Sequence, residues 1–423
     1  MAKRAVPQAE EHFEPIFVAR QPIFDRDQAI WGYDLLIHHS LDCEIAEAVD
    51  ECLAASRMIA DGFALAIQGI PDTTTVIVDM PLALILDQSV TALPKDRCLV
   101  GVVVEAPSKE ALAALQTLAA SGYRLAVEYW GQSGVDPLLD IAKVVRVPIA
   151  NRSPKEVMAL RRALKKRPGL AMAQDVSDWQ TFAGTRSLGF QLFQGLFFRR
   201  PEIVAGRTLS TGAAARVRLL RELHNPDVEI SDLSAVISSD LALSYRLLRF
   251  INSAGFGLKH TVQSISQAIS LLGLSAFKQW AAVVAMSDVD TSGKGQELAY
   301  LALQRARFFE TAAEGAAAPY SREGMFLLGL LSTLDAMFGR DMAEVLADMP
   351  LDEGIKAALL GQPSPGRHWL DLIQAVERGD WGTVETLCAE LRLQPKTAAV
   401  LYLKATSWAQ RHSQESKTPQ ESS

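Results

Sequence analysis

The chain has 423 residues, which is enough for two or three domains with well-filled cores. Hydrophobic residues make up 49% of it and charged residues 22%, proportions that are ordinary for a globular protein in water. The formal net charge of −7 argues against a nucleic-acid-binding surface spread over the whole molecule, although it leaves room for a local basic patch.

The cysteines and the N-terminus indicate a compartment. The cysteines form no C-x-x-C pair, which argues against a disulfide framework or a zinc site and fits a reducing environment; they are Cys43, Cys52, Cys98 and Cys388. Residues 1–14 lack the apolar run of a signal peptide. No apolar stretch approaches the ~18 residues needed to span a bilayer. We therefore expect a cytoplasmic protein that does not insert into a membrane.

Short β-branched runs alternate with helical patterns between residues 16 and 203. This alternation predicts a mostly parallel sheet covered by helices, and the number of units suggests closure into a barrel. The expected strands are Phe17–Ala19, Ile30–Ile37, Thr75–Asp79, Leu99–Glu105, Arg124–Glu128, Lys143–Val147, Leu170–Ala173 and Gln191–Phe198. The expected helices are Cys43–Ala66, Ser108–Ala120 and Pro154–Lys166, the last capped by Ser153.

After Gly212 the strand signal disappears and apolar spacing predicts helices only. These helices are Ala213–Leu223, Ser231–Val236, Leu241–Asn252, Ser264–Leu272, Ala276–Ser287, Glu297–Ala318, Met325–Phe338 and Thr397–Gln410. We expect a disordered N-terminus (1–14), a barrel domain (15–205), a helical domain (206–410) and a disordered polar tail (411–423). The fold class is thus α/β followed by all-α.

The segment FVARQPIFDRDQAIWGYDLLIHHS, Phe17–Ser40, resembles the first strands of an EAL domain, the barrel that hydrolyses cyclic di-GMP. In that family the segment ends in Glu-Ala-Leu or Glu-Leu-Leu, with an arginine two residues later. The glutamate binds a catalytic metal and the arginine holds a nucleotide phosphate. Here Asp34 stands for the glutamate and His38 for the arginine. The resemblance covers residues 15–201 and implies a TIM-like (β/α) barrel.

At the other positions of the family's site, most residues are changed. Each of the following is the residue that the resemblance places at a metal-binding or nucleotide-contacting position: Asp79, Val102, Glu128, Tyr129, Arg146, Gln174 and Gln194. Only Gln194, in the closing Gln-Gly motif, matches the family. Two-metal phosphodiester hydrolysis needs several oxygen ligands, and Val102, Tyr129 and Gln174 remove them.

This eroded set predicts that the chain is not an enzyme but a pseudo-phosphodiesterase with no catalytic residues, metal or cofactor. The simplest interpretation of Asp34, Asp79 and Glu128 is that they are residual polar groups at strand ends. A surviving single-metal site and a metal-free nucleotide pocket are the alternatives. The residues expected to contact a nucleotide are Gln21, His38 and Gln194.

Residues 219–273 resemble an HDOD domain, a relative of the HD phosphohydrolases that lacks their metal centre. The resemblance rests on Asp240, Leu248–Asn252, Phe256-Gly257 and the Leu271-Leu272-Gly273 run. An HD hydrolase needs a His-Asp dipeptide among its ligands, and none of the seven histidines forms one. Together the two resemblances cover nearly the whole chain, in the order of fused EAL–HDOD signalling proteins.

The sequence therefore predicts a non-catalytic regulator related to cyclic di-GMP signalling, acting through protein partners. A metal-independent cyclic di-GMP receptor is the alternative, and an active cyclic di-GMP phosphodiesterase is a third interpretation. Protein partners are expected, cyclic di-GMP is a candidate ligand, and neither a nucleic acid nor a membrane is expected.

Overall fold

The computed structural model describes residues 16–39, 70–86, 89–200, 229–238, 265–274, 292–314, 318–347 and 351–415, together with residues 63, 67, 247, 277, 278 and 281. The helices expected at 43–66, 213–223, 241–252 and 276–287 lie mostly or wholly outside these ranges. So do the boundary near residue 205 and the residues at 240, 248–252 and 256–257 that carry the HDOD resemblance.

Eight strands form a closed barrel in chain order, as expected. Strand β1 is antiparallel to both of its neighbours, β2 and β8, while the other pairs are parallel. The strands are β1 Ile16–Phe24, β2 Ile30–His39, β3 Thr75–Asp79, β4 Cys98–Val102, β5 Arg124–Glu128, β6 Val144–Pro148, β7 Leu170–Gln174 and β8 Leu192–Gln194. Three expected strands differ most in extent. Strand β1 continues to Phe24, five residues beyond the expected end at Ala19. Strand β4 ends three residues before Glu105, where the chain bends ahead of Pro107, and β8 gives way to a 3₁₀ turn, η2 (Phe197–Arg199).

Side chains alternate along each strand, so one face fills the barrel and the other contacts the helices outside it. The interior holds a small apolar cluster formed by Ile23, Ile77, Leu99, Ala126, Val144, Met172 and Leu192, all 2% exposed or less. On each parallel strand, the residue two positions after a member of this cluster therefore points into the carboxyl end of the barrel, which we call the barrel mouth. This alternation decides which predicted site residues meet there.

The described helices of the barrel are short. They are α2 Leu82–Leu86, α3 Lys109–Ala120, α4 Asp136–Ile141, α5 Pro154–Ala163 and α6 Trp179–Ser187, with the 3₁₀ turn η1 at Ser89–Ala92. A side chain caps the N-terminus of α3, α5 and α6. The cap predicted at Ser153 is confirmed: its hydroxyl accepts from the Glu156 amide, and the Glu156 carboxylate accepts from the Ser153 amide. Pro154 occupies the first turn, where a missing N–H costs no hydrogen bond.

The C-terminal region is helical in all its described parts. Its helices are α8 Ile230–Ser238, α10 Ile265–Leu272, α12 Gly293–Ala312, α13 Arg322–Leu331, α14 Leu334–Phe338, α15 Met342–Leu346, α16 Glu353–Leu359, α17 Pro365–Arg378, α18 Trp381–Glu390 and α19 Pro395–Glu415. The single helix expected over 325–338 is two helices, α13 and α14. Helix α19 continues five residues into the segment expected to be a disordered tail. Among the described helices, none has the length and apolarity to cross a membrane.

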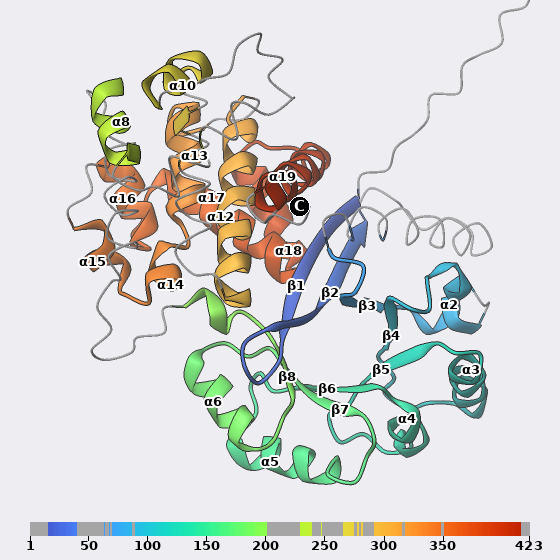
Figure 1. Cartoon of the computed structure of the whole chain (residues 1–423). Coiled ribbons are helices and arrows are strands. Elements are labelled where there is room, and N and C mark those ends of the chain that lie inside the picture. Colours follow the sequence, from blue (N-terminus) through green and yellow to red (C-terminus); the bar gives the residue numbers. More distant parts are fainter. Residues whose placement is uncertain are drawn as a thin grey trace, which may run out of the picture.

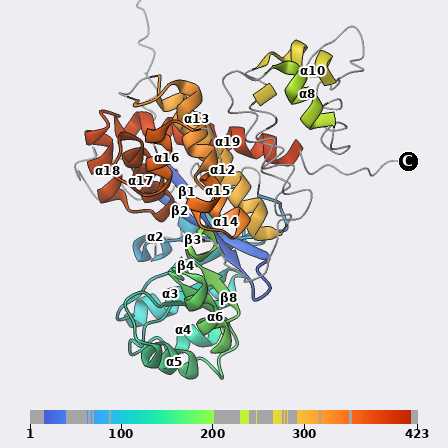
Figure 2. The same ribbon diagram turned by 90° about the vertical axis from the view of Figure 1, so that its left-hand side faces the viewer.

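The β1–β2 hairpin extends from the barrel and packs against the helical region (Figures 1 and 2). The Arg20 guanidinium lies 3.9 Å from the centre of the Tyr300 ring, and the Tyr33 hydroxyl donates to Glu297 at 3.0 Å. In the first turn of α12, the Lys294 ammonium lies over the Trp179 ring of α6. Helices α17 and α19 also contact β1, so the two regions share one apolar core.

Candidate functional site

Polar side chains from seven of the eight strands meet at the barrel mouth. Register places Gln21 opposite Asp34 and Glu128 beside Arg146, and the strand alternation turns all of them inward. The inward-facing set is Gln21, Asp34, Asp79, Glu128, Arg146, Gln174 and Gln194. In barrels of this kind the carboxyl ends of the strands are where ligands bind. Most of the residues predicted for the site are thus brought together.

The Arg146 guanidinium lies at the centre of this set and is fully buried. Its Nη2 is 2.6 Å from Oδ1 of Asp79, and its Nη1 is 4.0 Å from Oδ2 of Asp34. The Asp34 side chain is only 4% exposed, whereas that of Asp79 is 48% exposed. A buried guanidinium is tolerated only when carboxylates pair with it, and these two aspartates do so.

Carboxylates outnumber cations at the mouth, and the pKa values of several of these carboxyl groups are raised. Burial, the Asp79 charge and the charges of Glu128 and Asp175 raise the pKa of Asp34 to about 7, against the opposing pull of Arg146. Burial also raises the pKa values of Glu128 and Asp175. Asp34 is therefore partly protonated at neutral pH, which lowers the negative charge of the site.

Gly101 leaves room for the Asp79 carboxylate, a role that no sequence pattern indicated. It lies opposite Asp79 in the β3–β4 ladder and shares the interior-facing side of β4 with Leu99. A Cβ at Gly101 would overlap Oδ1 of Asp79. The missing side chain is therefore what lets the Asp79 carboxylate turn toward Arg146.

Several buried polar atoms at the mouth have no hydrogen-bond partner among the described residues. They are Oδ1 of Asp34, Nε and Nη1 of Arg146, Oε1 of Gln174 and Oε1 of Gln194. Buried polar atoms are nearly always paired in folded proteins, so a cluster of unpaired ones calls for an explanation. A polar ligand is one such explanation.

Two of the predicted site residues, Val102 and Tyr129, do not line the mouth with their side chains. Val102 lies on the outward face of β4 with Val100, and Tyr129 packs half-buried against the main core while its amide donates to the Arg146 carbonyl at 2.7 Å. His38 pairs with Phe17 in the hairpin, and its side chain lies outside the described residues. The substitutions at Val102 and Tyr129 therefore say little about the ligands available inside the barrel.

The EAL resemblance implies divalent metals, and the side chains at the mouth do not fit one as they stand. The part of the chain that the structure describes contains no group of three or more His, Cys, Asp or Glu residues arranged to hold a metal ion. Arg146 occupies the space between the two aspartates that would be the nearest ligands.

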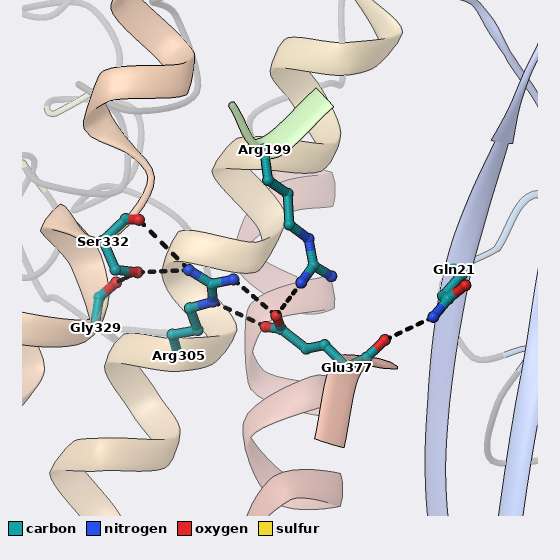
Figure 3. Close-up of polar contacts among 6 residues, drawn as sticks. All are labelled: Gln21, Arg199, Arg305, Gly329, Ser332 and Glu377. Carbon is teal, nitrogen blue, oxygen red and sulfur yellow. Dashed lines mark hydrogen bonds and ion pairs between the residues drawn. The ribbon is translucent and has the colours of Figure 1, made fainter. Parts of the chain in front are cut away.

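A second polar cluster connects the mouth to the helical region (Figure 3). Gln21 accepts a hydrogen bond from Gln194 and donates to the Glu377 carbonyl at 2.9 Å. The Glu377 carboxylate accepts from Arg305 at 2.8 and 2.7 Å and from Arg199 at 2.5 Å. Arg305 also donates to the Ser332 hydroxyl at 2.9 Å. The sequence prediction missed this cluster because α17, which carries Glu377, was not expected.

Comparison with known proteins identifies the helical region. Residues 209–346 match the HDOD domain family. The chain is 28% identical over 414 residues to a Vibrio cholerae protein named cyclic di-GMP phosphodiesterase CdgJ, covering 96% of this chain and 95% of that one. It is 27% identical over 405 residues to the uncharacterised protein YuxH of Bacillus subtilis, covering 93% and 98% of the two chains. A solved complex of Klebsiella pneumoniae BlrP1 with manganese and cyclic di-GMP gives a TM-score of 0.37 at 19% identity, over 45% of this chain and 56% of that one.

The relative from Vibrio cholerae contradicts the prediction that this chain is not an enzyme, because a full-length relative is named for the hydrolysis of cyclic di-GMP. The prediction rested partly on Val102 and Tyr129, whose side chains face away from the mouth. The closed eight-stranded barrel and the family match that follows it confirm the expected architecture: a (β/α) barrel is followed by a helical region in which residues 209–346 match the HDOD domain family.

Proposed function

We propose that this chain is a cyclic di-GMP signalling protein that binds the dinucleotide at the barrel mouth. The observation that carries the proposal is the cluster of buried, unpaired polar atoms on Asp34, Arg146, Gln174 and Gln194. They lie at the end of the barrel where ligands of such folds bind. The name of the Vibrio cholerae relative supports the choice of ligand.

The chemistry of the mouth suits a ligand with both phosphates and guanine bases. The Arg146 guanidinium is a phosphate partner, since its Nε and Nη1 have no hydrogen bond in the described chain. Guanine presents N–H donors, which Oε1 of Gln174 and the carboxylate of Glu128 can accept. Half-exposed Asp79 marks the open side of the mouth. Because Asp34 titrates near pH 7, an anionic ligand is repelled less at pH 6 than at pH 8.

Calorimetry with the full chain tests this function. Cyclic di-GMP is titrated at pH 6.0 and 8.0, in EDTA and in Mg²⁺, with cyclic di-AMP as the control ligand. We expect saturable binding of cyclic di-GMP in EDTA as well as in Mg²⁺, and tighter binding at the lower pH. No binding under any of the four conditions would contradict the proposal.

Hydrolysis of the bound dinucleotide is the second candidate function, and the observation that favours it is the relative named as a phosphodiesterase. Chromatography of cyclic di-GMP incubated with the protein and Mg²⁺ or Mn²⁺ would detect the linear product. Turnover that disappears in the Asp34→Asn variant would assign the activity to this barrel. Turnover that persists in that variant would point to a contaminating enzyme.

We also propose that the helical region transmits the signal to a protein partner. Apolar side chains are exposed at its outer end: Leu271 of α10 is 53% exposed, and Leu274 just beyond it is 37% exposed. Exposed apolar residues that lie close together often mark a partner site. The substitution Leu271→Glu should abolish capture of a specific partner while cyclic di-GMP binding is unchanged; unchanged capture would place the interface elsewhere.

A further inference from the structure

A cavity of about 660 Å³ lies between the loops that follow β7 and β8 and the helices α12 to α17. Its most unusual feature is its arginines, which come from both regions: Arg199, Arg200, Arg305, Arg367 and Arg378. Two carboxylates, Asp175 and Asp335, also line it. A volume of this size is typical of small-molecule sites.

The inner wall of the cavity contains more positive than negative charge. Glu377 is 1% exposed and is shared by two guanidiniums, Arg305 at 3% and Arg199 at 10% side-chain exposure. One carboxylate therefore neutralises only one of two buried cations. Arg305 donates two hydrogen bonds to the Glu377 carboxylate, whereas Arg199 donates one. Burial and the neighbouring Arg305 charge lower the pKa of Arg199, although Glu377 opposes this.

Arg199 has donors to spare for a ligand. Its Nε and Nη2 are buried and have no hydrogen-bond partner among the described residues. A guanidinium in this condition is destabilised unless an anion completes its hydrogen bonds. The N–H groups of Nε and Nη2 of Arg199 are therefore available to donate to an anionic group in the cavity.

The other lining residues extend this preference for anions. Arg200 and Arg378 are exposed at the rim, and neither makes a side-chain hydrogen bond or ion pair within the described chain. Arg367 is paired with Asp371 at 2.6 Å. The lining carboxylates Asp175 and Asp335 offset part of this charge; burial raises the pKa of Asp175 and raises that of Asp335 to about 6. Apolar side chains of Met342, Leu359 and Leu370 line the same cavity.

We propose that this interdomain cavity, which adjoins the barrel mouth and shares Gln21 with it, is a second binding site for a phosphate-bearing nucleotide. The phosphate contacts Arg199 from within and Arg378 from the rim, because arginine forks match phosphate oxygens. The base packs on the apolar side chains of the cavity wall. Since Arg199 belongs to the barrel and Arg305 to the helical region, a nucleotide here contacts both regions at once.

Calorimetry of the full chain with three probes tests the site: inorganic phosphate, GMP and cyclic di-GMP, each at low ionic strength. The variants are Arg378→Gln, which changes an exposed side chain and should not affect folding, and Arg199→Lys, which keeps the charge but loses the fork. Arg162→Gln on α5, also exposed, is the matched control. Circular dichroism checks that each variant is folded.

We expect GMP or cyclic di-GMP to bind, and the Kd to rise at least 10-fold in both cavity variants and to stay unchanged in the control. Binding of inorganic phosphate alone would contradict the nucleotide assignment. Absence of binding by all three probes would overturn the proposal. Nucleotide binding that is weakened by Gln174→Ala at the barrel mouth but not by Arg378→Gln or Arg199→Lys would also overturn it, while leaving the proposed function intact.

Discussion

Replacing Asp34 by asparagine should change how the stability of the protein depends on pH. The folded Asp34 carboxyl has a pKa of about 7, compared with an ordinary value of 3.8, because it is buried beside other carboxylates. Between these two values the folded state keeps a proton that the unfolded chain releases. The wild type therefore loses stability as the pH rises toward and through 7, whereas an asparagine at this position cannot titrate.

The size of the effect follows from the two pKa values. The free energy of unfolding changes by about 1.4 kcal/mol per pH unit wherever the folded state binds one proton more than the unfolded state. For a carboxyl that titrates near 7 when folded, the loss between pH 5 and pH 8 is on the order of 2.5 kcal/mol. Most of this loss falls between pH 5 and pH 7. Arg146 keeps its closer partner, Asp79 at 2.6 Å, in the variant.

Urea denaturation followed by tryptophan fluorescence at pH 5, 6, 7 and 8 measures this dependence. The quantity compared is the difference in unfolding free energy between Asp34→Asn and the wild type, since the pH dependence of groups that do not interact with Asp34 cancels in it. We expect this difference to move by roughly 2 to 3 kcal/mol in favour of the variant between pH 5 and 8. A difference that stays constant with pH would refute the account of Asp34 as a buried carboxyl with a raised pKa.

Three further substitutions test other parts of the structure. Gly101→Ala should push Asp79 away from Arg146 and lower the free energy of unfolding by about 2 to 4 kcal/mol, measured by thermal or urea unfolding. The control is Gly184→Ala, where a Cβ meets nothing within 4 Å and stability should not change. Equal effects of the two substitutions would contradict the role assigned to Gly101. Glu377→Gln should lower the free energy of unfolding by about 3 to 5 kcal/mol, because it leaves two buried guanidiniums without a carboxylate. The control is Glu390→Gln, which changes an exposed side chain. A Glu377→Gln variant as stable as the wild type would mean that the cluster is not buried in solution. Tyr33→Phe should cost about 1 kcal/mol, since it removes one buried hydrogen bond to Glu297, and a loss below 0.3 kcal/mol, by urea denaturation, would argue against this contact.

Much of the barrel could be predicted from the sequence because its strands are short apolar runs set between polar turns. Thr75–Asp79 and Arg124–Glu128 begin and end as expected. The sequence did not predict which residues of β4 face the interior of the barrel. A run of valines carries no alternation, and a shift of one residue exchanges the two faces. Only the pairing with β3 shows that Gly101, and not Val102, lies beside Asp79.

The candidate site could be predicted as a set of residues but not as an arrangement. Asp34, Asp79 and Arg146 were each identified, but their contact depends on closure of the barrel, which joins strands more than 100 residues apart. Helix α17 was not among the expected helices, although Trp369, Ile373 and Val376 recur at helical spacing on its buried face. Its boundaries were also marked in the sequence, by Pro365 in the first turn and by Gly379 just after the end.

The claim that a cyclic dinucleotide binds at the barrel mouth is tested most directly by comparing two glutamine variants in calorimetry with cyclic di-GMP. Gln174→Ala removes a mouth side chain whose Oε1 has no partner in the described chain, so folding should not suffer. Gln116→Ala removes an exposed glutamine from α3, outside the barrel. We expect Gln174→Ala to raise the Kd for cyclic di-GMP about 5- to 10-fold, the value of one hydrogen bond, and Gln116→Ala to leave it unchanged. Equal Kd values for the wild type and both variants would contradict binding at the mouth.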